Sequence, residues 1–415
     1  MFKLSRGHRT SHGIGAFMAW ALTWTPVIPA VAVTPHHKIP LFCTCSHEVQ
    51  PICGVQGPED IELTPDGKDL VISELPPDFT HPASSDGLLL VDLTNDRVRP
   101  LPIVSEPEIA WGDPNCTAPP AQLGSHGIHL SKRSDGRTEL LVVNHAERES
   151  IEAFELRSGS GGYRAIWHGC VSHPTGLLND VAATGDGGFI ATVTIEKALL
   201  SRKDVVDVLV SGADTGYLVE WHPGTALRRL ANSEAPGNNG IQLSIDGRFI
   251  YFAAWTKKQI RRYDRQAQRV TQIVDVPFYP DNLSVRGDGM LIAAGLDELD
   301  SWKACAKAHS PLCETGFTVM TLNPLTLATQ LLYKGKPGIL TSTSVAVQVD
   351  NTLYVGAGKG DRLLKINLGG RATRSRAVWR SNSTGYPAVN CAVVPSTPDV
   401  DPARTPVIRG SSALP

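Results

Sequence analysis

The sequence of 415 residues predicts an all-β protein, a six-bladed β-propeller, and a sixfold repeat is the first observation that indicates it. Each repeat has one or two polar side chains, a short β-rich run with a turn, and a second apolar run. The six repeats begin at Glu59, His126, Asn179, Asn239, Asp281 and Thr341. A period of about 40 to 65 residues that is built of short strands is typical of propellers.

Turn chemistry and composition are the other two observations that favour this fold. Asp66-Gly67 precedes the apolar run 70–72, and Asp246-Gly247 precedes the apolar run 249–254. Asp-Gly pairs favour tight hairpin turns, because glycine accepts the positive φ that such turns require. The 38 Gly, the 30 Pro and the low charged fraction of 19% suit a protein made of strands and turns.

The N-terminal 32 residues predict a cleavable secretory signal. Three basic residues within the first nine positions are followed by an apolar stretch and by Ala30-Val31-Ala32, a small-residue cleavage site. The alternative is an uncleaved membrane anchor, but the apolar run is short and is interrupted by Pro26 and Pro29. We therefore expect a secreted or periplasmic protein, which would contact a membrane only through this segment if it stayed uncleaved.

The rest of the chain divides by composition into three parts. We expect an irregular lead-in over 33–54, the propeller over 55–370, and a C-terminal extension over 371–415. The extension is rich in Ser, Thr and Pro without periodicity, so disorder is expected from about residue 395. Two long insertions, 106–123 and 199–215, would form a lid over the channel mouth, and the second would include a helix.

Eight cysteines in an exported chain predict disulfides. Cys305 and Cys313 have the spacing of a local loop staple, and Cys116 and Cys170 are expected on the same face of the propeller. The other four flank the repeats: Cys43, Cys45, Cys53 and Cys391. One bridge between the two ends would close the ring, while Cys43-Thr44-Cys45 could alternatively bind a soft metal. The connectivity stays open at this point.

Several function classes lack support in the sequence. The net charge of -2 and the pI near 6.7 give no electrostatic argument for a nucleic acid partner. No G-x-S-x-G elbow and no H-E-x-x-H motif occurs, which argues against a serine hydrolase of the usual fold and against a zincin. No G-x-G-x-x-G opens a helix after a strand, so a dinucleotide site is not expected.

The repeats do predict a central calcium site. The innermost strand of each blade lines the channel of a propeller, so polar residues that start these strands converge at the channel mouth. Carboxylates, carboxamides and an imidazole would meet there, and Ca²⁺ takes about 6 to 8 oxygen ligands. Adjacent residues of a strand point to opposite sides, so Glu59-Asp60 and Asn179-Asp180 would each direct one side chain to the mouth and one inward.

Six short strings resemble the paraoxonase/arylesterase family of calcium-dependent lactonases, which neighbours the gluconolactonase-like six-bladed propellers. In chain order they are PEDIE, SHGIHLS, LLVVNHAERESIEAFEL, LNDVAATGDGG, NNGIQLSIDGRFIYFAAW and PDNLSVRGDG. The resemblance implies two Ca²⁺ ions. The catalytic ion would be held by Glu59, Asn179, Asn239, Asp281 and Asn282, and the buried structural ion by Asp60, Asp180 and the backbone carbonyl of Ile128. The family's histidine dyad falls on His126 and His145.

The chain departs from the family pattern at its ends. Leu363-Leu364-Lys365 stands where the animal enzymes place the cysteine that closes the ring, and the N-terminal cysteine is closer to the acidic pair than in those enzymes. The two ends would thus be tied differently here, through Cys391 or not at all.

The resemblance implies a secreted calcium-dependent hydrolase of lactones, with aryl esters as a second class of small-molecule substrate. Two carboxylates and three amides would neutralise one Ca²⁺ and leave positions for water and a substrate oxygen. The ion would stabilise the oxyanion, and His126, assisted by His145, would activate water, for which the free imidazole pKa of about 6.5 is suitable. A metal-bound water or a carboxylate is the alternative base. The alternative functions are a sugar-lactone hydrolase and a non-catalytic propeller that calcium makes rigid.

Overall fold

A computed structural model describes residues 49–76, 87–200, 203–308, 310, 313, 315–369, 375–379 and 389–393. The expected signal segment 1–32, Cys43, Cys45, the side chain of Cys391 and the tail expected from residue 395 lie outside the described residues and side chains.

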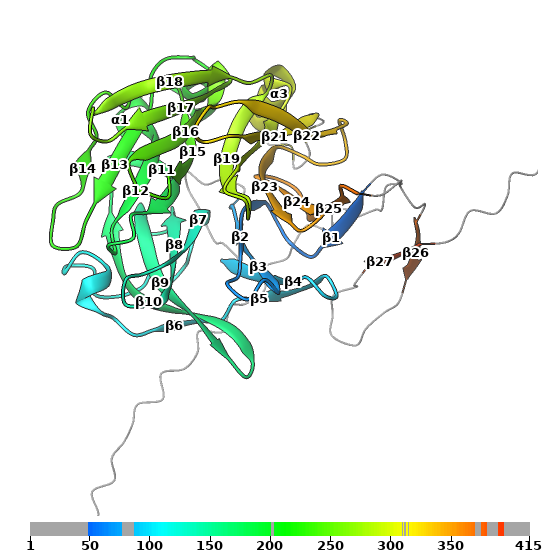
Figure 1. Ribbon diagram of the computed structural model, residues 1–415, viewed down its shortest axis with the longest axis horizontal. Helices are drawn as coiled ribbons and strands as arrows, with labels where there is room; N and C mark the ends of the chain where they lie inside the picture. The colour runs from blue at the N-terminus through cyan, green and yellow to red at the C-terminus, as the bar shows by residue number, and fades with distance from the viewer. Residues whose placement is uncertain are drawn as a thin grey trace, which may run out of the picture. The chain divides into compact units, whose positions relative to one another are not determined.

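Six sheets are arranged around a central axis, so the prediction of a six-bladed propeller is confirmed (Figure 1). Strands are given from the axis outward. Blade 1 contains β2 (Pro58–Leu63), β3 (Asp69–Glu74), β4 (Leu88–Asp92) and β5 (Arg97–Pro100). Blade 2 contains β7 (Ser125–Lys132), β8 (Thr138–Asn144), β9 (Ser150–Gly159), β10 (Gly162–Ser172) and β6 (Ile103–Ser105). Blade 3 contains β11 (Gly176–Ala183), β12 (Phe189–Glu196), β13 (Tyr217–Trp221) and β14 (Arg228–Arg229).

The second half of the ring repeats this plan. Blade 4 contains β15 (Asn238–Leu243), β16 (Phe249–Ala254), β17 (Gln259–Asp264) and β18 (Arg269–Asp275). Blade 5 contains β19 (Tyr279–Val285), β20 (Leu291–Leu296), β21 (Phe317–Leu322) and β22 (Thr329–Gly335). Blade 6 contains β23 (Thr343–Val349), β24 (Thr352–Ala357), β25 (Arg362–Asn367) and β1 (Gln50–Cys53). A separate antiparallel pair is formed by β26 (Ser375–Trp379) and β27 (Val389–Val393).

Strand pairing between the two ends closes the ring. The strand β1 pairs antiparallel with β25, with Pro51 opposite Leu364 and Ile52 opposite Leu363. Residues 50–53, which the sequence places in an irregular lead-in, therefore form the outer strand of the last blade. A four-residue strand whose partner is more than 300 residues away has no local signal, because its hydrogen bonds all come from the other end of the chain.

Six clusters of the hydrophobic core each fill the space between two adjacent blades, and a smaller seventh cluster packs α2 against blade 3. The strand β16 shows why its apolar run is continuous. Ile250 and Phe252 pack toward blade 3, whereas Tyr251 between them packs toward blade 5. Alternate residues of a strand face opposite sides, so a middle strand of a blade must be apolar on both.

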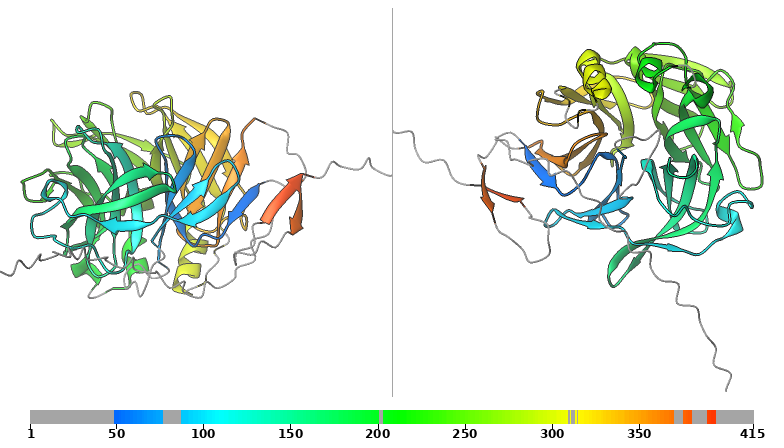
Figure 2. Two further views of the ribbon diagram at one scale, coloured as in Figure 1. Left: turned by 90° about the horizontal axis from the view of Figure 1, so that it is seen from below. Right: turned by 180° about the vertical axis from the view of Figure 1, so that it is seen from behind.

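Helical turns lie on the face at which the inner strands begin. The helices α1 (Lys197–Leu200) and α2 (Val205–Leu209) follow β12, and α3 (Leu299–Lys307) follows β20 (Figure 2). The helix expected in the insertion from residue 199 is thus found as two short helices. Two 3-10 turns, η1 (Ile109–Trp111) and η2 (Trp255–Lys257), complete the elements. Within the described ranges, no helix has the length and apolar character that crossing a membrane requires.

Two disulfides are formed within blades. Cys305 and Cys313 are bonded as the expected loop staple, and Cys116 is bonded to Cys170 of β10; Cys53 is disulfide-bonded as well. The Cys116 bridge holds the first insertion against the outer edge of blade 2, where the Glu106 N–H donates to the carbonyl of Trp167. The first half of this insertion therefore does not form the expected lid, because its backbone is bonded to β10.

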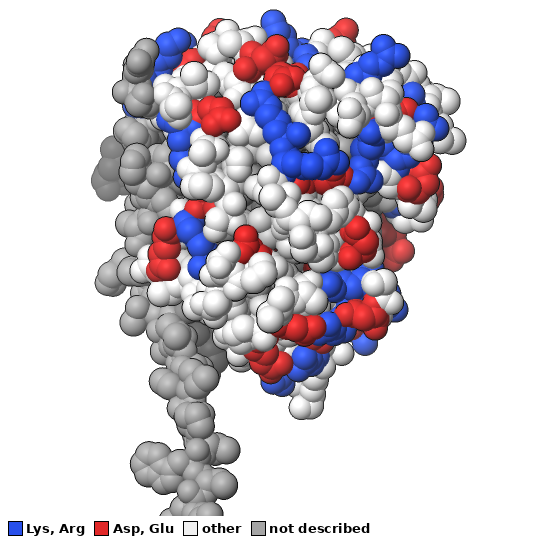
Figure 3. Space-filling view, turned by 90° about the vertical axis from the view of Figure 1, so that its left-hand side faces the viewer, with Lys and Arg blue, Asp and Glu red and all other residues white. Residues whose placement is uncertain are grey.

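Charged side chains of both signs are scattered among neutral ones on the face that is built mainly by blades 2 to 4 (Figure 3). This mixture fits the small net charge of -2.

Candidate metal centre and histidine pair

Each inner strand has a β-bulge at the same place. The pairing with the second strand shifts so that two residues of the inner strand lie opposite one residue of its neighbour. The bulged pairs are 59–60, 126–127, 179–180, 239–240, 281–282 and 344–345. A bulge frees residues from the ladder and redirects their side chains. The polar residues therefore lie inside the inner strands, where each bulged pair begins one to three positions after the first residue of the strand, and not at the strand start that the sequence predicts.

Two buried aspartates join consecutive blades through these bulges. Asp60 accepts a hydrogen bond from the N–H of Ile128 in blade 2 at 2.7 Å, and Asp180 accepts one from the N–H of Ile241 in blade 4 at 2.8 Å. The other oxygen of each carboxylate accepts from the N–H of the residue that follows it. Each aspartate thus occupies the same position in a contact between two inner strands.

Glu59 links three further blades. Its Oε1 accepts from Nδ2 of Asn282 in blade 5 at 2.8 Å, and its backbone carbonyl accepts from Oγ of Ser344 in blade 6 at 2.6 Å. Nε2 of His126 in blade 2 lies 3.6 Å from the same Oε1. Segments more than 200 residues apart in sequence therefore converge on one carboxylate, as the propeller prediction requires.

Four side-chain oxygens at this point fit a hard cation. Glu59 Oε2, Asn179 Oδ1, Asn239 Oδ1 and Asn282 Oδ1 are buried and have no hydrogen-bond partner within the described part of the chain. Each polar atom that is buried without a partner lowers the stability of the folded state by about 1–3 kcal/mol. Carboxylate and amide oxygens are the ligands that Ca²⁺ prefers. All four belong to the predicted ligand set of the catalytic calcium.

Buried carboxylates at the same place also favour a cation. Burial, together with the negative charges of neighbouring carboxylates such as Glu59, raises the pKa of Asp60, Asp180 and Asp281 above the ordinary range. A positive ion would offset both effects. Among the described residues, no three His, Cys, Asp or Glu side chains are grouped as metal ligands. This absence does not argue against the predicted set, because three of its five side chains are amides.

Glycines in the bulges allow the strands that carry the predicted ligands to approach closely. A Cβ on Gly127 would lie 2.5 Å from the carbonyl oxygen of Asn179 and 2.6 Å from Oδ1 of Asp180. A Cβ on Gly240 would meet Asn282 in the same way, and it would lie 2.6 Å from the backbone nitrogen of Leu283. These contacts are far below van der Waals distance, so both positions require glycine.

Gly127→Ala is expected to lower the free energy of unfolding by about 1–3 kcal/mol, the usual cost of overpacking, and to weaken calcium binding because Asp180 must move. Thermal melts with and without Ca²⁺ measure both effects. The matched control is Gly161→Ala in the same blade, where an added Cβ meets nothing within 4 Å among the described atoms. Equal melts of the two variants would contradict the close packing of the ring.

The two predicted histidines form a buried hydrogen-bonded pair beside Glu59. His126 Nδ1 lies 2.8 Å from His145 Nε2, and His145 follows β8, where its N–H donates to the carbonyl of Gly124. On its other side, His145 Nδ1 lies 2.9 Å from Oε1 of Glu149. Glu149 is not among the residues predicted from the sequence. The available signal was an acid in the turn after His145, but Glu147 in the same turn fits that description equally well.

Glu149 is ionised at neutral pH in this environment. Burial alone would raise the pKa of its carboxyl group, but the charge of His145 and hydrogen bonds from His145 and the Leu178 N–H hold that pKa below its ordinary value. The carboxylate is therefore available as an acceptor for His145 Nδ1.

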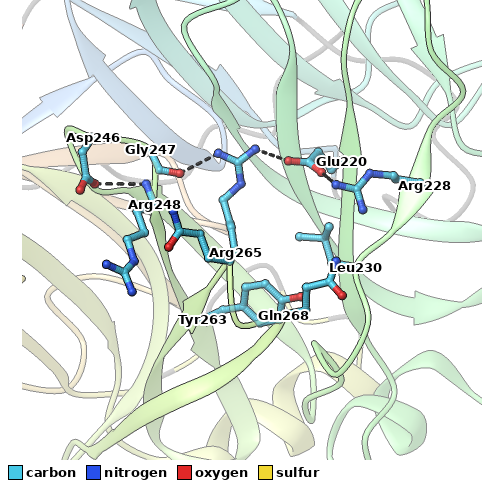
Figure 4. A pocket seen from close by; sticks show the side chains of 10 residues that line it. Glu220, Arg228, Leu230, Asp246, Gly247, Arg248, Tyr263, Arg265 and Gln268 are labelled. Carbon is cyan, nitrogen blue, oxygen red and sulfur yellow. Dashed lines mark hydrogen bonds and ion pairs between the residues drawn. The ribbon is translucent and has the colours of Figure 1, made fainter.

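A separate pocket of about 320 Å³ lies between blades 3 and 4 (Figure 4). It is beside the turn 246–247, which is at the opposite end of the inner strand from the bulge. Arg228 and Arg265 both bond to the buried carboxylate of Glu220, and Figure 4 shows Arg265 between Glu220 and Gly247. These three charges are paired with one another, and none of the predicted site residues lines the pocket.

The Arylesterase family model matches residues 49–361. The chain belongs to this family. It is 27% identical to mouse serum paraoxonase/arylesterase 1 over 241 residues, which is 55% of this chain and 63% of that protein. For the human serum paraoxonase/arylesterase 1 the identity is 27% over 260 residues, 57% of this chain and 68% of that protein. The match thus spans less than two thirds of the mouse relative.

Among solved structures, the periplasmic gluconolactonase of Pseudomonas aeruginosa is similar at a TM-score of 0.40 and 15% identity, over 75% of this chain and 86% of that chain.

Eight of the ten predicted site residues lie in the bulges of five blades. The other two are Ile128, which directly follows a bulge, and His145. The N–H of Ile128 is bonded to Asp60, and ligation by its carbonyl stays a prediction. The metal-binding and catalytic roles of the other nine predicted site residues also stay predictions.

Proposed function

We propose that this protein is a secreted hydrolase that uses Ca²⁺ to open lactones and to cleave aryl esters. The observation that carries the proposal is the set of four buried oxygens without a hydrogen-bond partner among the described residues, one of which belongs to Glu59, the carboxylate that lies 3.6 Å from His126. Membership of the arylesterase family supports it independently, because sequence family and local geometry are separate sources of evidence.

Glu59, Asn179, Asn239, Asp281 and Asn282 would hold the catalytic ion, and Asp60, Asp180 and the carbonyl of Ile128 would hold the second ion. When bound, the catalytic Ca²⁺ supplies positive charge where the oxyanion of the attacked carbonyl develops. The amide-rich set leaves the site with little excess negative charge, which favours the approach of an ester oxygen.

His126 acts as the general base. Its Nδ1 is bonded to His145, so Nε2 on the side of Glu59 is the atom that takes a proton from the attacking water. The water oxygen bonds to the carbonyl carbon, and the carbon–oxygen bond of the ester breaks. The proton then passes from His126 to the leaving alkoxide, which gives a carboxylic acid and an alcohol, or a hydroxy acid from a lactone.

Hydrolysis of a substrate panel tests the proposal. Small aliphatic lactones, a sugar lactone and an aryl acetate are assayed with chelator and then with added Ca²⁺. We expect turnover of lactones and aryl esters that chelator abolishes and Ca²⁺ restores. Turnover of the sugar lactone alone would favour the sugar-lactone hydrolase, and no turnover of any substrate by a calcium-stabilised protein would favour a binding propeller.

Glu59→Ala and Asn282→Ala are each expected to lower turnover by about tenfold to a hundredfold, as loss of one electrostatic stabiliser does. Excess Ca²⁺ should restore part of the loss, because the remaining ligands still bind the ion. The rate as a function of calcium concentration measures this. Asn351→Ala is the control, since Asn351 is an exposed turn residue between β23 and β24. Wild-type rates in both site variants would contradict catalytic calcium binding.

Export of the protein is part of the proposal. The Cys116–Cys170 and Cys305–Cys313 disulfides are typical of proteins that fold in oxidising compartments. Two relatives carry the word serum in their names. The partner that the proposal requires is a small-molecule ester or lactone.

A further inference from the structure

A buried chain of polar contacts runs from the metal centre to the protein surface. It passes from His126 to His145 at 2.8 Å and from His145 to Glu149 at 2.9 Å, and it ends at Lys197, whose Nζ lies 3.3 Å from Oε2 of Glu149. The side chain of His145 is 0% exposed and that of Glu149 is 3% exposed, whereas that of Lys197 is 39% exposed. Proton positions along this chain are therefore set by the protein and not by solvent.

In the form in which both histidine rings are neutral, the carboxylate determines the direction of every hydrogen bond in the chain. An ionised glutamate only accepts, so His145 must donate from Nδ1–H to Oε1 of Glu149. Nε2 of neutral His145 then has a lone pair, and the Nδ1–H of His126 donates to it. This leaves the lone pair of His126 on Nε2, the atom 3.6 Å from Glu59 Oε1.

We propose that Glu149 is a positioning residue that sets the tautomer of His145 and, through it, the tautomer of His126. The inference rests on the proposed function, because an unprotonated Nε2 on His126 matters for catalysis only if this atom accepts a proton from water. Glu149 touches neither substrate nor metal and acts entirely through the two rings.

The surroundings of Glu149 keep its carboxylate fixed. Oε1 also accepts from the backbone N–H of Leu178 at 2.8 Å, and Leu178 directly precedes the bulge of blade 3. Lys197 at the start of α1 compensates the charge on Oε2. The relay is thus attached to the strand that carries Asn179, so the rings and one predicted metal ligand share a rigid support.

A tautomer measurement tests the inference in the wild-type protein without any assay of turnover. In protein with ¹⁵N-labelled histidine, long-range ¹H–¹⁵N spectra distinguish Nδ1–H from Nε2–H rings. We expect His126 and His145 both to be Nδ1–H, with signals assigned by their loss in His126→Gln and His145→Gln. A wild-type His126 with its proton on Nε2 would overturn the proposal, whatever the protein hydrolyses.

Glu149→Gln tests the consequence for catalysis. The amide can both donate and accept, so it no longer forces one tautomer on His145. We expect kcat to fall about tenfold to a hundredfold, as for other groups that orient a ligand or base, with KM and the calcium dependence of the melt unchanged. The spectra should show loss of the pure Nδ1–H state.

Glu155→Gln is the matched control. Glu155 is a buried glutamate on β9, the strand that begins directly after Glu149, and it also contacts a histidine, with Oε2 at 3.3 Å from His168 Nε2. This pair has no contact with the relay among those described, so kcat should keep its wild-type value. Wild-type kcat and tautomers in Glu149→Gln would refute the positioning role.

The two proposals fail separately. If the wild-type protein hydrolyses no ester or lactone but shows the expected Nδ1–H rings, the proposed function fails and the tautomer assignment holds. If Glu149→Gln does not fold, the wild-type spectra still decide the assignment.

Discussion

Excess chelator is expected to lower the melting temperature of this protein by on the order of ten degrees. An ion that binds only the folded state stabilises it by about 4 kcal/mol at a concentration 1,000 times its Kd, and each kcal/mol shifts the melting temperature of a large domain by about 2–4 °C. Asp60 and Asp180 are 5% and 2% exposed and join the inner strands of four blades. If the proposed structural Ca²⁺ binds there, its loss would leave two buried carboxyl groups in the middle of the ring without a cation.

Differential scanning calorimetry with chelator, with added Ca²⁺ and with added Mg²⁺ measures the effect. Asp180→Asn should remove most of the calcium dependence of the melt. Asp69→Asn is the control, because Asp69 is a buried carboxylate of blade 1 that pairs with Arg99 at 2.9 Å. It should lower the melting temperature and keep the calcium dependence. A wild-type melt that chelator does not change would remove the structural calcium from the proposal.

The pH dependence of stability should differ between the calcium-free and calcium-bound protein. In the calcium-free protein the pKa values of Asp60, Asp180 and Asp281 are raised by burial and by neighbouring carboxylates. The folded state then holds these protons more tightly than the unfolded state does. The stability that these three groups contribute is therefore fully present below the unfolded carboxyl pKa of about 3.9 and is lost as pH rises through the raised values.

Calcium should reverse this trend, because ligation requires the ionised carboxylates and protons compete with the ion. Denaturant unfolding at a series of pH values, in chelator and in excess Ca²⁺, measures the two slopes. Parallel slopes would contradict a shared role of these aspartates in binding a cation.

The fold, and the convergence of the polar positions of the repeats near the axis, could be predicted because the repeat itself carries the signal. Each inner strand has polar residues followed by an apolar run, as in Asn239 before Ile241, and a propeller brings such positions to one axis. The bulge could not be predicted. A polar pair before an apolar run has the same pattern whether it precedes a strand or interrupts its ladder, and only the pairing partner distinguishes the two cases.

Long-range partners explain the remaining differences. The short strand β1 depends entirely on β25, and Glu149 depends on the packing of blade 3 against the turn after β8. From the sequence, Glu147 could equally well be the partner of His145, but in the structure it accepts a hydrogen bond from the N–H of Ala121 at an exposed position. Local residues do not determine which of the two glutamates contacts His145, since both are in the same five-residue turn.

His126→Gln is expected to lower kcat by about two to four orders of magnitude, the usual contribution of a positioned general base. His145→Gln should cost less, about tenfold to a hundredfold, because His145 acts through the ring of His126. Calcium affinity and the melting temperature should change little in either variant, since neither histidine is in the predicted ligand set. Steady-state kinetics and melts on the same preparations measure both.

His129→Gln is the matched control for His126, because His129 is on the same strand β7 and its Nδ1 lies 3.4 Å from Glu62 Oε1. It should retain nearly full turnover. The acid limb of the wild-type pH–rate profile, which reflects protonation of the base, should be absent in His126→Gln and present in His129→Gln. If the limb persists in His126→Gln, the proton acceptor is another group of the ring, with Glu59 as the nearest carboxylate, and His126 serves only to shape the site.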